Sequence, residues 1–351
     1  MTLTRFDRTY GALLGLAFGD AIAFPALFHR TYQFPEKRRD FLWNTNRDLA
    51  RQRVIRLMLP FTHRIPAETL APFPTDDTEY AIFCAQTLMA SGAEPTTADF
   101  AAAWRARVLP QAETVLTGFS ERAALVNLAR GDEPPATGND NPQHYDDSAV
   151  CRAVAVGLYC AGDPERAARI AEQDACVTNA EDGVYAARAM AAAIAGLAGG
   201  DDLGLAIGRG RAELPADSWI ARGDAIAQAC LRETEGVPDL VLALTTRLIN
   251  TVYSYGNAAP ETLPAAFALV TRCAGEMDAA VLAANAIPKA ADSLPAMVGA
   301  LCGARQGSGA VSPGWREQLD TCRGLCLPFV AGVRLSDVAQ ALANATAEVR
   351  A

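Results

Sequence analysis

The run Thr75-Asp76-Asp77-Thr78-Glu79 has the clearest potential for metal chemistry in this chain of 351 residues. The apolar residues 80–89 that follow predict a helix, so the two adjacent aspartates fall at a helix start. Carboxylate and hydroxyl oxygens suit Mg²⁺, Mn²⁺ or Ca²⁺ better than zinc. The run therefore predicts a site for a hard divalent cation. A simpler alternative is a helix cap, because Thr and Asp are favoured caps and acids stabilise the first turn.

Helices must position these residues, because helical patterns dominate the chain. Ala- and Leu-rich stretches recur between Gly, Pro, Asp and Asn, and the alternation typical of strands is almost absent. Asp163-Pro164 predicts a helix start, and Gly199-Gly200 predicts a helix end. We expect an all-α fold with helices at about 11–18, 80–89, 163–177, 182–197, 216–233, 238–252, 260–273, 277–287, 294–306 and 336–350.

Three polar or Gly-rich stretches predict long loops, namely residues 29–74, 131–147 and 306–313. Loops of this length in a compact domain are more often functional than accidental. We also expect a turn at Gly19-Asp20, where the first buried helix leads into a loop. Asp20 lies within an apolar run, which argues against a signal peptide and against a membrane span there.

The charge and the cysteines exclude several classes of protein. A net charge of −9 argues against a nucleic-acid binder, which needs an excess of Lys and Arg. The nine cysteines form no C-x-x-C pair and lie mostly in apolar context, so we interpret them as reduced core residues. Both features favour a cytoplasmic protein that binds neither nucleic acid nor membrane.

Five segments resemble the ADP-ribosylglycohydrolase family, in the family's own order. The first segment, Gly11–Gly15 with Gly19-Asp20-Ala21, resembles "GALLGLAxGDALG". The second, residues 75–78, matches the "TDDT" metal motif. Ser148–Tyr159 followed by Thr178 resembles "NGxxMRxxPLGL…TH". Glu261–Ala266 resembles "ETLPAAL", and Ala290–Gln306 resembles "DxDTxAxxxGAxxGAxxG". Together these segments span most of the chain.

The resemblance implies one compact orthogonal helical bundle over residues 1–351, with a variable insert at about 29–74. It implies a hydrolase that cleaves the glycosidic bond of an ADP-ribosyl or related ribosyl adduct, on a protein or a small molecule. In such a site a metal holds the ribose hydroxyls, and a carboxylate activates water or balances charge at the anomeric carbon.

The resemblance also implies which residues do the work. The metal positions are Thr75, Asp76, Asp77, Asp292 and Ser293, of which Asp76 and Asp77 are also the catalytic candidates. The substrate-binding positions are Asp147, Ser148, Asn179, Tyr255 and Gly256. Asp20 is expected to order its loop rather than to bind metal.

Several positions depart from the family pattern. Leu27 replaces the usual Glu, Ala290 the first Asp of "DxDT", Pro288 the Gly before that motif, Asn179 the usual His, and Asp147-Ser148 the usual Asn-Gly. Fewer carboxylates make a pair of dications harder to hold. We therefore expect one Mg²⁺ or Mn²⁺ ion rather than two, unless Asp146, Asp147 or Glu36 compensates.

Three hypotheses follow from these matches and departures. The first is a metal-assisted hydrolase of ADP-ribosyl or related ribosyl adducts. The second is a catalytically impaired protein on the same fold that binds ADP-ribose or a nucleotide, or serves a structural role. The third is a hydrolase whose substrate has changed toward a smaller ribosyl metabolite.

Overall fold

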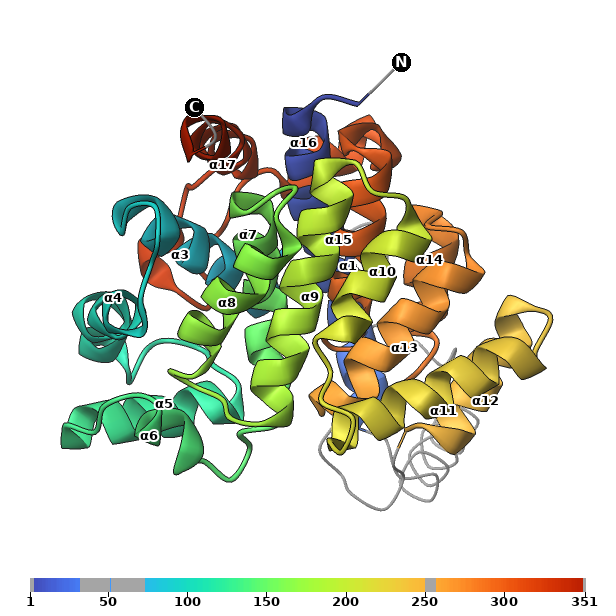
Figure 1. Cartoon of the computed structure of the whole chain (residues 1–351), viewed down its shortest axis with the longest axis horizontal. Coiled ribbons are helices and arrows are strands. Elements are labelled where there is room, and N and C mark those ends of the chain that lie inside the picture. Colours follow the sequence, from blue (N-terminus) through green and yellow to red (C-terminus); the bar gives the residue numbers. More distant parts are fainter. Residues whose placement is uncertain (1–2, 32–50, 52–72, 250–256, 350–351) are drawn as a thin grey trace.

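The computed structural model describes residues 3–31, 51, 73–249 and 257–349, and these residues form an all-helical fold (Figure 1). Within them no strand forms, and the β-pairing consists of isolated bridges at Asp146–Ala258 and Thr321–Arg334. The α-helices are α1 (Arg5–Thr31), α3 (Asp76–Ala90), α4 (Thr97–Ala103), α5 (Phe119–Arg130), α6 (Ala136–Asn139), α7 (Ser148–Tyr159), α8 (Pro164–Ala175), α9 (Asp182–Gly199), α10 (Leu203–Ala212), α11 (Trp219–Glu233), α12 (Val237–Arg247), α13 (Ala259–Arg272), α14 (Met277–Asn285), α15 (Leu294–Gln306), α16 (Pro313–Leu319) and α17 (Leu335–Val349). The shorter helical turns are η2 (Trp104–Val108), η3 (Leu109–Gln111), η4 (Ser308–Ala310) and η5 (Pro328–Val330).

Three helices form the centre of the molecule. Figure 1 shows α1, α9 and α15 side by side, with α5 and α6 at the lower left and α11 and α12 crossing at the lower right. Helix α9 is buried along nearly its whole length, and most of its buried side chains are alanine. A helix that is apolar on all sides belongs inside a fold, and small side chains let its neighbours approach closely.

Glycines bring α1 and α15 into backbone contact. Gly11, Gly15 and Gly19 recur every four residues and so share one face of α1. A Cβ atom added to Gly15 would lie 2.0 Å from the carbonyl oxygen of Gly299 on α15. A Cβ added to Gly303 would lie 1.9 Å from the carbonyl oxygen of Gly11. Any larger residue would therefore push the two helices apart.

Several helix ends follow the sequence predictions. The Asp163 carboxylate accepts the backbone N–H of Arg166 at 3.1 Å, which confirms the cap of α8. Gly200 ends α9 with φ +103°, a left-handed conformation that glycine adopts without strain. The prediction for residues 294–306 coincides with α15. The sequence analysis did not predict α4, α5, α6, α7, α10 and α16, and α6 lies within the loop predicted at 131–147.

The predicted turn at Gly19-Asp20 is wrong, because α1 continues as a helix to Thr31. Gly19 packs against the backbone of α15, where a Cβ would lie 2.0 Å from the carbonyl oxygen of Pro295. The glycine therefore serves helix packing and not a turn. The first three residues of the loop predicted at 29–74 belong to α1, and residue 51 is helical; most of the rest falls outside the described residues.

The described chain contains no helix with the length and apolarity needed to cross a membrane. All nine cysteines are free, and all but Cys176 are buried. The thiols therefore act as small core side chains, as the sequence predicted.

Gly15→Ala should lower the free energy of unfolding by about 1–3 kcal/mol, because its methyl group overlaps the Gly299 carbonyl. Gly208→Ala is the matched control, since Gly208 lies exposed in α10 with open space around its Cβ position. That substitution should raise the free energy of unfolding by roughly 0.5–1 kcal/mol through helix propensity. Urea unfolding measures both, and equal effects at the two glycines would contradict the close packing of α1 and α15.

Candidate active site

Asp20 on α1 organises the start of α3. Its carboxylate accepts the backbone N–H groups of Thr75 (2.7 Å) and Thr78 (3.1 Å), together with the hydroxyls of both threonines. Thr75 stands at the N-cap position, but its own side chain caps nothing. The cap is thus supplied from another helix, so the simpler alternative in which Thr75 caps α3 is wrong. Asp20 was expected to order a loop of its own, but it lies within α1 and orders the start of α3 instead.

Glu79, in the first turn of α3, serves packing. It is fully buried, and its carboxylate accepts three consecutive backbone N–H groups, those of Leu325 (3.0 Å), Cys326 (2.8 Å) and Leu327 (2.8 Å). Charge-assisted hydrogen bonds of this kind are among the stronger ones in proteins. Glu79 therefore fastens α3 to the segment that leads into η5.

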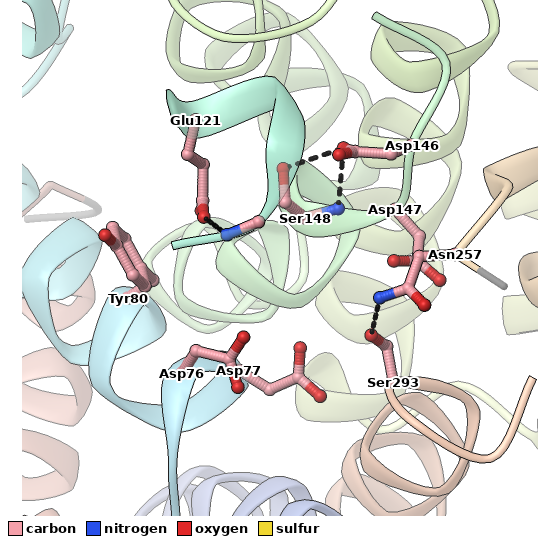
Figure 2. A pocket seen from close by; sticks show the side chains of 10 residues that line it. Asp76, Asp77, Tyr80, Glu121, Asp146, Asp147, Ser148, Asn257 and Ser293 are labelled. Atoms are coloured by element: carbon pink, nitrogen blue, oxygen red, sulfur yellow. Dashed lines mark hydrogen bonds between the residues drawn. The ribbon is translucent and has the colours of Figure 1, made fainter. Parts of the chain in front are cut away.

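Asp76 and Asp77 occupy the same turn as Glu79 but face a pocket (Figure 2). Burial, followed by the charges of Asp76 and Asp20, raises the pKa of Asp77 well above its usual range. Burial and the charge of Asp76 likewise raise the pKa of Asp20 to about 7, although its hydrogen bonds oppose the shift. Acidic groups are thus crowded together here.

Asp146 lies in the opposite wall of the pocket, and both oxygens of its carboxylate accept hydrogen bonds. It accepts hydrogen bonds from the Ser120 hydroxyl (2.7 Å), the Ser148 hydroxyl (2.9 Å) and the Asn179 side-chain amide (2.9 Å). The backbone N–H groups of Ser120 and Ser148 donate to it as well, each at 3.2 Å. Asp146 therefore shapes the wall of the pocket, and its role is to hold α5 against the start of α7.

Asp147 differs from its neighbour. Its N–H donates to the carbonyl of Asn257 at 2.9 Å, which ties the start of α7 to the start of α13. The side chain is buried, and its Oδ2 atom has no hydrogen-bond partner among the described residues. Burial and the charge of Asp146 raise its pKa to about 7. A buried carboxylate oxygen without a partner is costly, so this atom is well suited to receive a ligand.

Asn257 and Ser293 form the third side. The Asn257 amide lies 3.3 Å from Asp292 Oδ2 and 3.4 Å from Ser293 Oγ, and donates toward both. Figure 2 shows Ser293, at the start of α15, facing the same space as Asp77. Residues far apart in the sequence, around 76 and 293, therefore meet at one pocket.

A buried ion-pair network supports the wall behind the pocket. Glu121 on α5 accepts the Gly118 N–H at 2.8 Å and lies 3.3 Å from the guanidinium of Arg152. Arg152 is fully buried and also pairs with Asp174 at 2.9 Å and with the Thr178 hydroxyl at 2.8 Å. Burial raises the pKa of Glu121 to about 8, although Arg152 lowers it. One buried cation therefore serves two buried acids.

The pocket is small and strongly acidic. It has about 20 Å³ of space for the centres of water-sized groups, which fits an ion or one or two waters. Neither Arg nor Lys occurs among its described lining residues, and five of them are carboxylates. The lining residues are Asp76, Asp77, Tyr80, Gly118, Glu121, Asp146, Asp147, Ser148, Asn257 and Ser293.

The residues predicted from the sequence divide into four groups. Those that line the pocket are Asp76, Asp77, Asp147, Ser148 and Ser293. Thr75 and Asp292 lie one hydrogen bond away, on Asp76 and Asn257. Asn179 is fully buried beneath the wall and donates to Asp146. Tyr255, Gly256 and Glu36 lie outside the described residues.

Four lining residues were not predicted from the sequence, namely Tyr80, Gly118, Glu121 and Asn257. The Gly118 N–H donates to Glu121 as in one half of a capping box, but Gly118 has no side chain to complete the motif, so no sequence signal marked the start of α5. Asn257 carries no motif of its own and is identified only by the contact between α13 and α15. Ala290, where the family has Asp, is buried and apolar.

The donor set fits a hard divalent cation that keeps several waters. Among the described residues, no three side chains of His, Cys, Asp and Glu converge as a ready-made coordination sphere. Mg²⁺ does not require one, since it is usually bound through one or two carboxylates and retains water ligands. The unpartnered oxygen of Asp147 and the crowding of Asp76 and Asp77 are what an added cation would relieve.

Comparisons with known proteins identify the family and the fold of this chain. A protein-family model described as ADP-ribosylglycohydrolase matches residues 1–350. A solved structure titled "ADP-ribosylglycohydrolase-related protein complex" matches with a TM-score of 0.60 and 23% identity, over 97% of this chain and 99% of that chain. That likeness establishes the fold. No curated protein matches the sequence.

The acid cluster predicts that the metal-free protein becomes less stable as pH rises. A carboxyl group whose pKa is raised by folding favours the folded state below its unfolded pKa of about 4, and that contribution is lost as pH rises through the folded pKa. For Asp20 and Asp147 that value is about 7, and for Glu121 it is about 8. Urea unfolding with a chelator, from about pH 5 to about pH 9, should show a falling free energy of unfolding.

Asp147→Asn should make this pH dependence shallower, because it removes one of the carboxyl groups whose pKa is raised by folding. Asp217→Asn, at an exposed acid, is the control and should leave the slope unchanged. A free energy of unfolding that stays constant or rises over the same range would contradict the acid cluster.

Proposed function

Because the chain belongs to the ADP-ribosylglycohydrolase family, we propose that it is a metal-assisted hydrolase that cleaves the glycosidic bond of an ADP-ribosyl or related ribosyl adduct. The observation that carries this proposal is the meeting of Asp76, Asp77 and Ser293 at one pocket with the unpartnered oxygen of Asp147. An acidic, oxygen-lined pocket suits a reaction that develops positive charge on a sugar ring.

The metal of this proposal is a single Mg²⁺ or Mn²⁺ ion. The candidate ligands are Thr75, Asp76, Asp77, Asp292 and Ser293. One or two of these carboxylates would coordinate the ion directly and water would complete its shell, because no three His, Cys, Asp or Glu side chains converge among the described residues. When bound, such an ion orients ribose hydroxyls and lowers the pKa of a coordinated water. A single ion is proposed because the buried Ala290 offers no ligand where the family has a carboxylate.

The reaction needs a carboxylate that both accepts and returns a proton. The bond between the anomeric carbon and its nitrogen or oxygen substituent breaks, and the electron pair leaves with the substituent. A bond forms from the anomeric carbon to a water oxygen. Asp76 or Asp77 takes a proton from this water, and the leaving group gains one, so the charges balance. Asp147 stabilises the positive charge on the ring.

A second candidate function is binding without catalysis. It is supported by Ala290, which is buried and apolar, and by Asn179, whose amide is hydrogen-bonded to Asp146 beneath the pocket wall. Such a protein would bind ADP-ribose or a nucleotide, or act as a structural protein on the same fold. Metal binding without release of ADP-ribose from ADP-ribosylated peptides would favour a third possibility, a hydrolase for a smaller ribosyl compound.

The test combines metal titration with product release. We expect Mg²⁺ or Mn²⁺ to bind with a stoichiometry of one by calorimetry, and to support release of ADP-ribose or of a ribosyl product. Asp77→Asn should lower the rate of release by at least about 10²-fold, because it removes a ligand and the proton acceptor. Products are followed by chromatography on ADP-ribosylated arginine and serine peptides, and on a panel of ribosyl compounds.

Asp217→Asn is the matched control, since it makes the same chemical change at an exposed position away from the pocket. It should bind metal and release product as the wild type does. Absence of metal binding together with absence of release would sink the proposed hydrolase and favour the binding function.

A further inference from the structure

Lysine is rare in this chain, and one of its two lysines is buried close to the candidate site. The sequence holds 29 arginines but only Lys37 and Lys289 as lysines. Lys289 is 9% exposed and lies between α14 and α15, three residues before Asp292. A buried ammonium group is costly unless it is paired, so its partner indicates what the lysine does.

The partner of Lys289 is Glu261, in the first turn of α13. The Lys289 Nζ atom lies 3.0 Å from the Glu261 Oε2 atom, and the two side chains are 10% and 3% exposed. A buried pair of this kind need not add net stability, but it restricts the positions that the two segments can adopt. The pair therefore ties the turn before α15 to the start of α13.

The turn that carries Lys289 also carries two of the candidate metal ligands. The N–H of Leu294 donates to the carbonyl of Ala290 at 3.1 Å, so a helical turn already forms ahead of α15. Asp292 and Ser293 follow Lys289 by three and four residues, within about one turn of it. The intervening alanines have no polar side-chain atoms with which to hold this turn. The ion pair is therefore an anchor for the two ligands.

The start of α13 also holds the facing wall of the pocket. The N–H of Asp147 donates to the carbonyl of Asn257 at 2.9 Å, and the Asn257 amide donates toward Ser293 at 3.4 Å (Figure 2). Burial raises the pKa of Asp147, and hydrogen bonds from the side chains of Thr262 and Ser293 oppose that shift. Residues 257–262 thus contact the wall that carries Asp147 and, through Glu261, the turn that carries Ser293.

The spacing between these two walls matters because the pocket is small. Its space of about 20 Å³ for the centres of water-sized groups fits an ion. Metal ligands must lie within about 0.2 Å of their preferred distances. Residues that hold ligands in place without touching the metal typically change its affinity about 10–100-fold when they are removed. Neither Lys289 nor Glu261 lines the pocket, so both can act only through the ligands.

We infer that Lys289 and Glu261 are positioning residues for the metal site, because their ion pair sets the distance between the Ser293 turn and the Asp147 wall. The inference rests on the proposed function, since the metal belongs to that proposal. The pair controls the affinity of the pocket for a divalent cation and makes no contact with the ion or with the substrate.

The test measures Mg²⁺ and Mn²⁺ binding to the full chain by calorimetry. Lys289→Met combined with Glu261→Gln removes both charges, and replacement of a whole buried pair often preserves stability. Affinity for the metal should fall at least about tenfold. Arg211→Met with Asp224→Asn is the matched control, since that pair also lies at 3.0 Å but joins α10 to α11 outside the pocket lining. The control should bind metal as the wild type does.

A second variant tests the geometry even if the double variant does not fold. Glu261→Asp keeps both charges and shortens the anchor by one methylene group. The turn must then shift to keep the ion pair, or lose the pair, so metal binding should weaken by at least about threefold. Urea unfolding with a chelator shows which variants are folded.

Unchanged metal affinity in the folded variants would overturn the inference, as would equal losses in the double variant and in the control. Absence of metal binding by the wild type would overturn it together with the metal of the proposed function. Metal binding that depends on the pair, without release of any ribosyl product, would leave the inference standing and remove only the hydrolase. Hydrolysis by a protein whose metal affinity ignores the pair would do the reverse.

Discussion

The structure depends on the contact between the backbones of α1 and α15. Ordinary helices pack with their axes about 8–10 Å apart because side chains separate them. Here glycines meet glycines, and a single methyl group at Gly15 would collide with the Gly299 carbonyl. Since α1 and α15 run in opposite directions along this contact, the far end of α1 reaches the start of α15. Asp20 and Ser293 are thereby brought to the same end of the molecule, and α3 begins where they meet.

That contact makes possible a cluster of acids that would repel one another in water. The carboxylates in and beside the pocket have different partners and therefore different roles. Asp20 and Asp146 are saturated with hydrogen bonds, Glu121 shares the buried Arg152 with Asp174, and Asp147 keeps an oxygen without a partner. The hydrogen-bonded carboxylates of Asp20 and Asp146 and the ion pair of Glu121 stabilise the walls of the pocket. The unpartnered oxygen of Asp147 lies where a cation or a sugar hydroxyl would bind.

The sequence identified the parts of this site that lie in compact motifs. Asp76 and Asp77 follow from a local pattern, Ser293 follows from the resemblance to the family, and the helical class follows from the recurring Ala- and Leu-rich segments. The capping of α3 by Asp20 could not be predicted, because that interaction links residues 55 positions apart. The turn at Gly19-Asp20 was wrong for the same reason, since a close helix contact uses the glycine that a turn would use. Glu121 and Asn257 reach the pocket only through packing between helices, which no short pattern records.

The first turn of α3 holds three acids with two unrelated duties. Asp76 and Asp77 face the pocket, whereas Glu79 is fully buried and binds the backbone of Leu325, Cys326 and Leu327. During evolution the first two positions can drift once an activity is no longer selected, while the third remains constrained by foldability. A descendant that has lost its chemistry would thus still carry Glu79, the residue that directly follows the motif. Glu79 alone would therefore not indicate an active enzyme, and the aspartate pair is the better diagnostic.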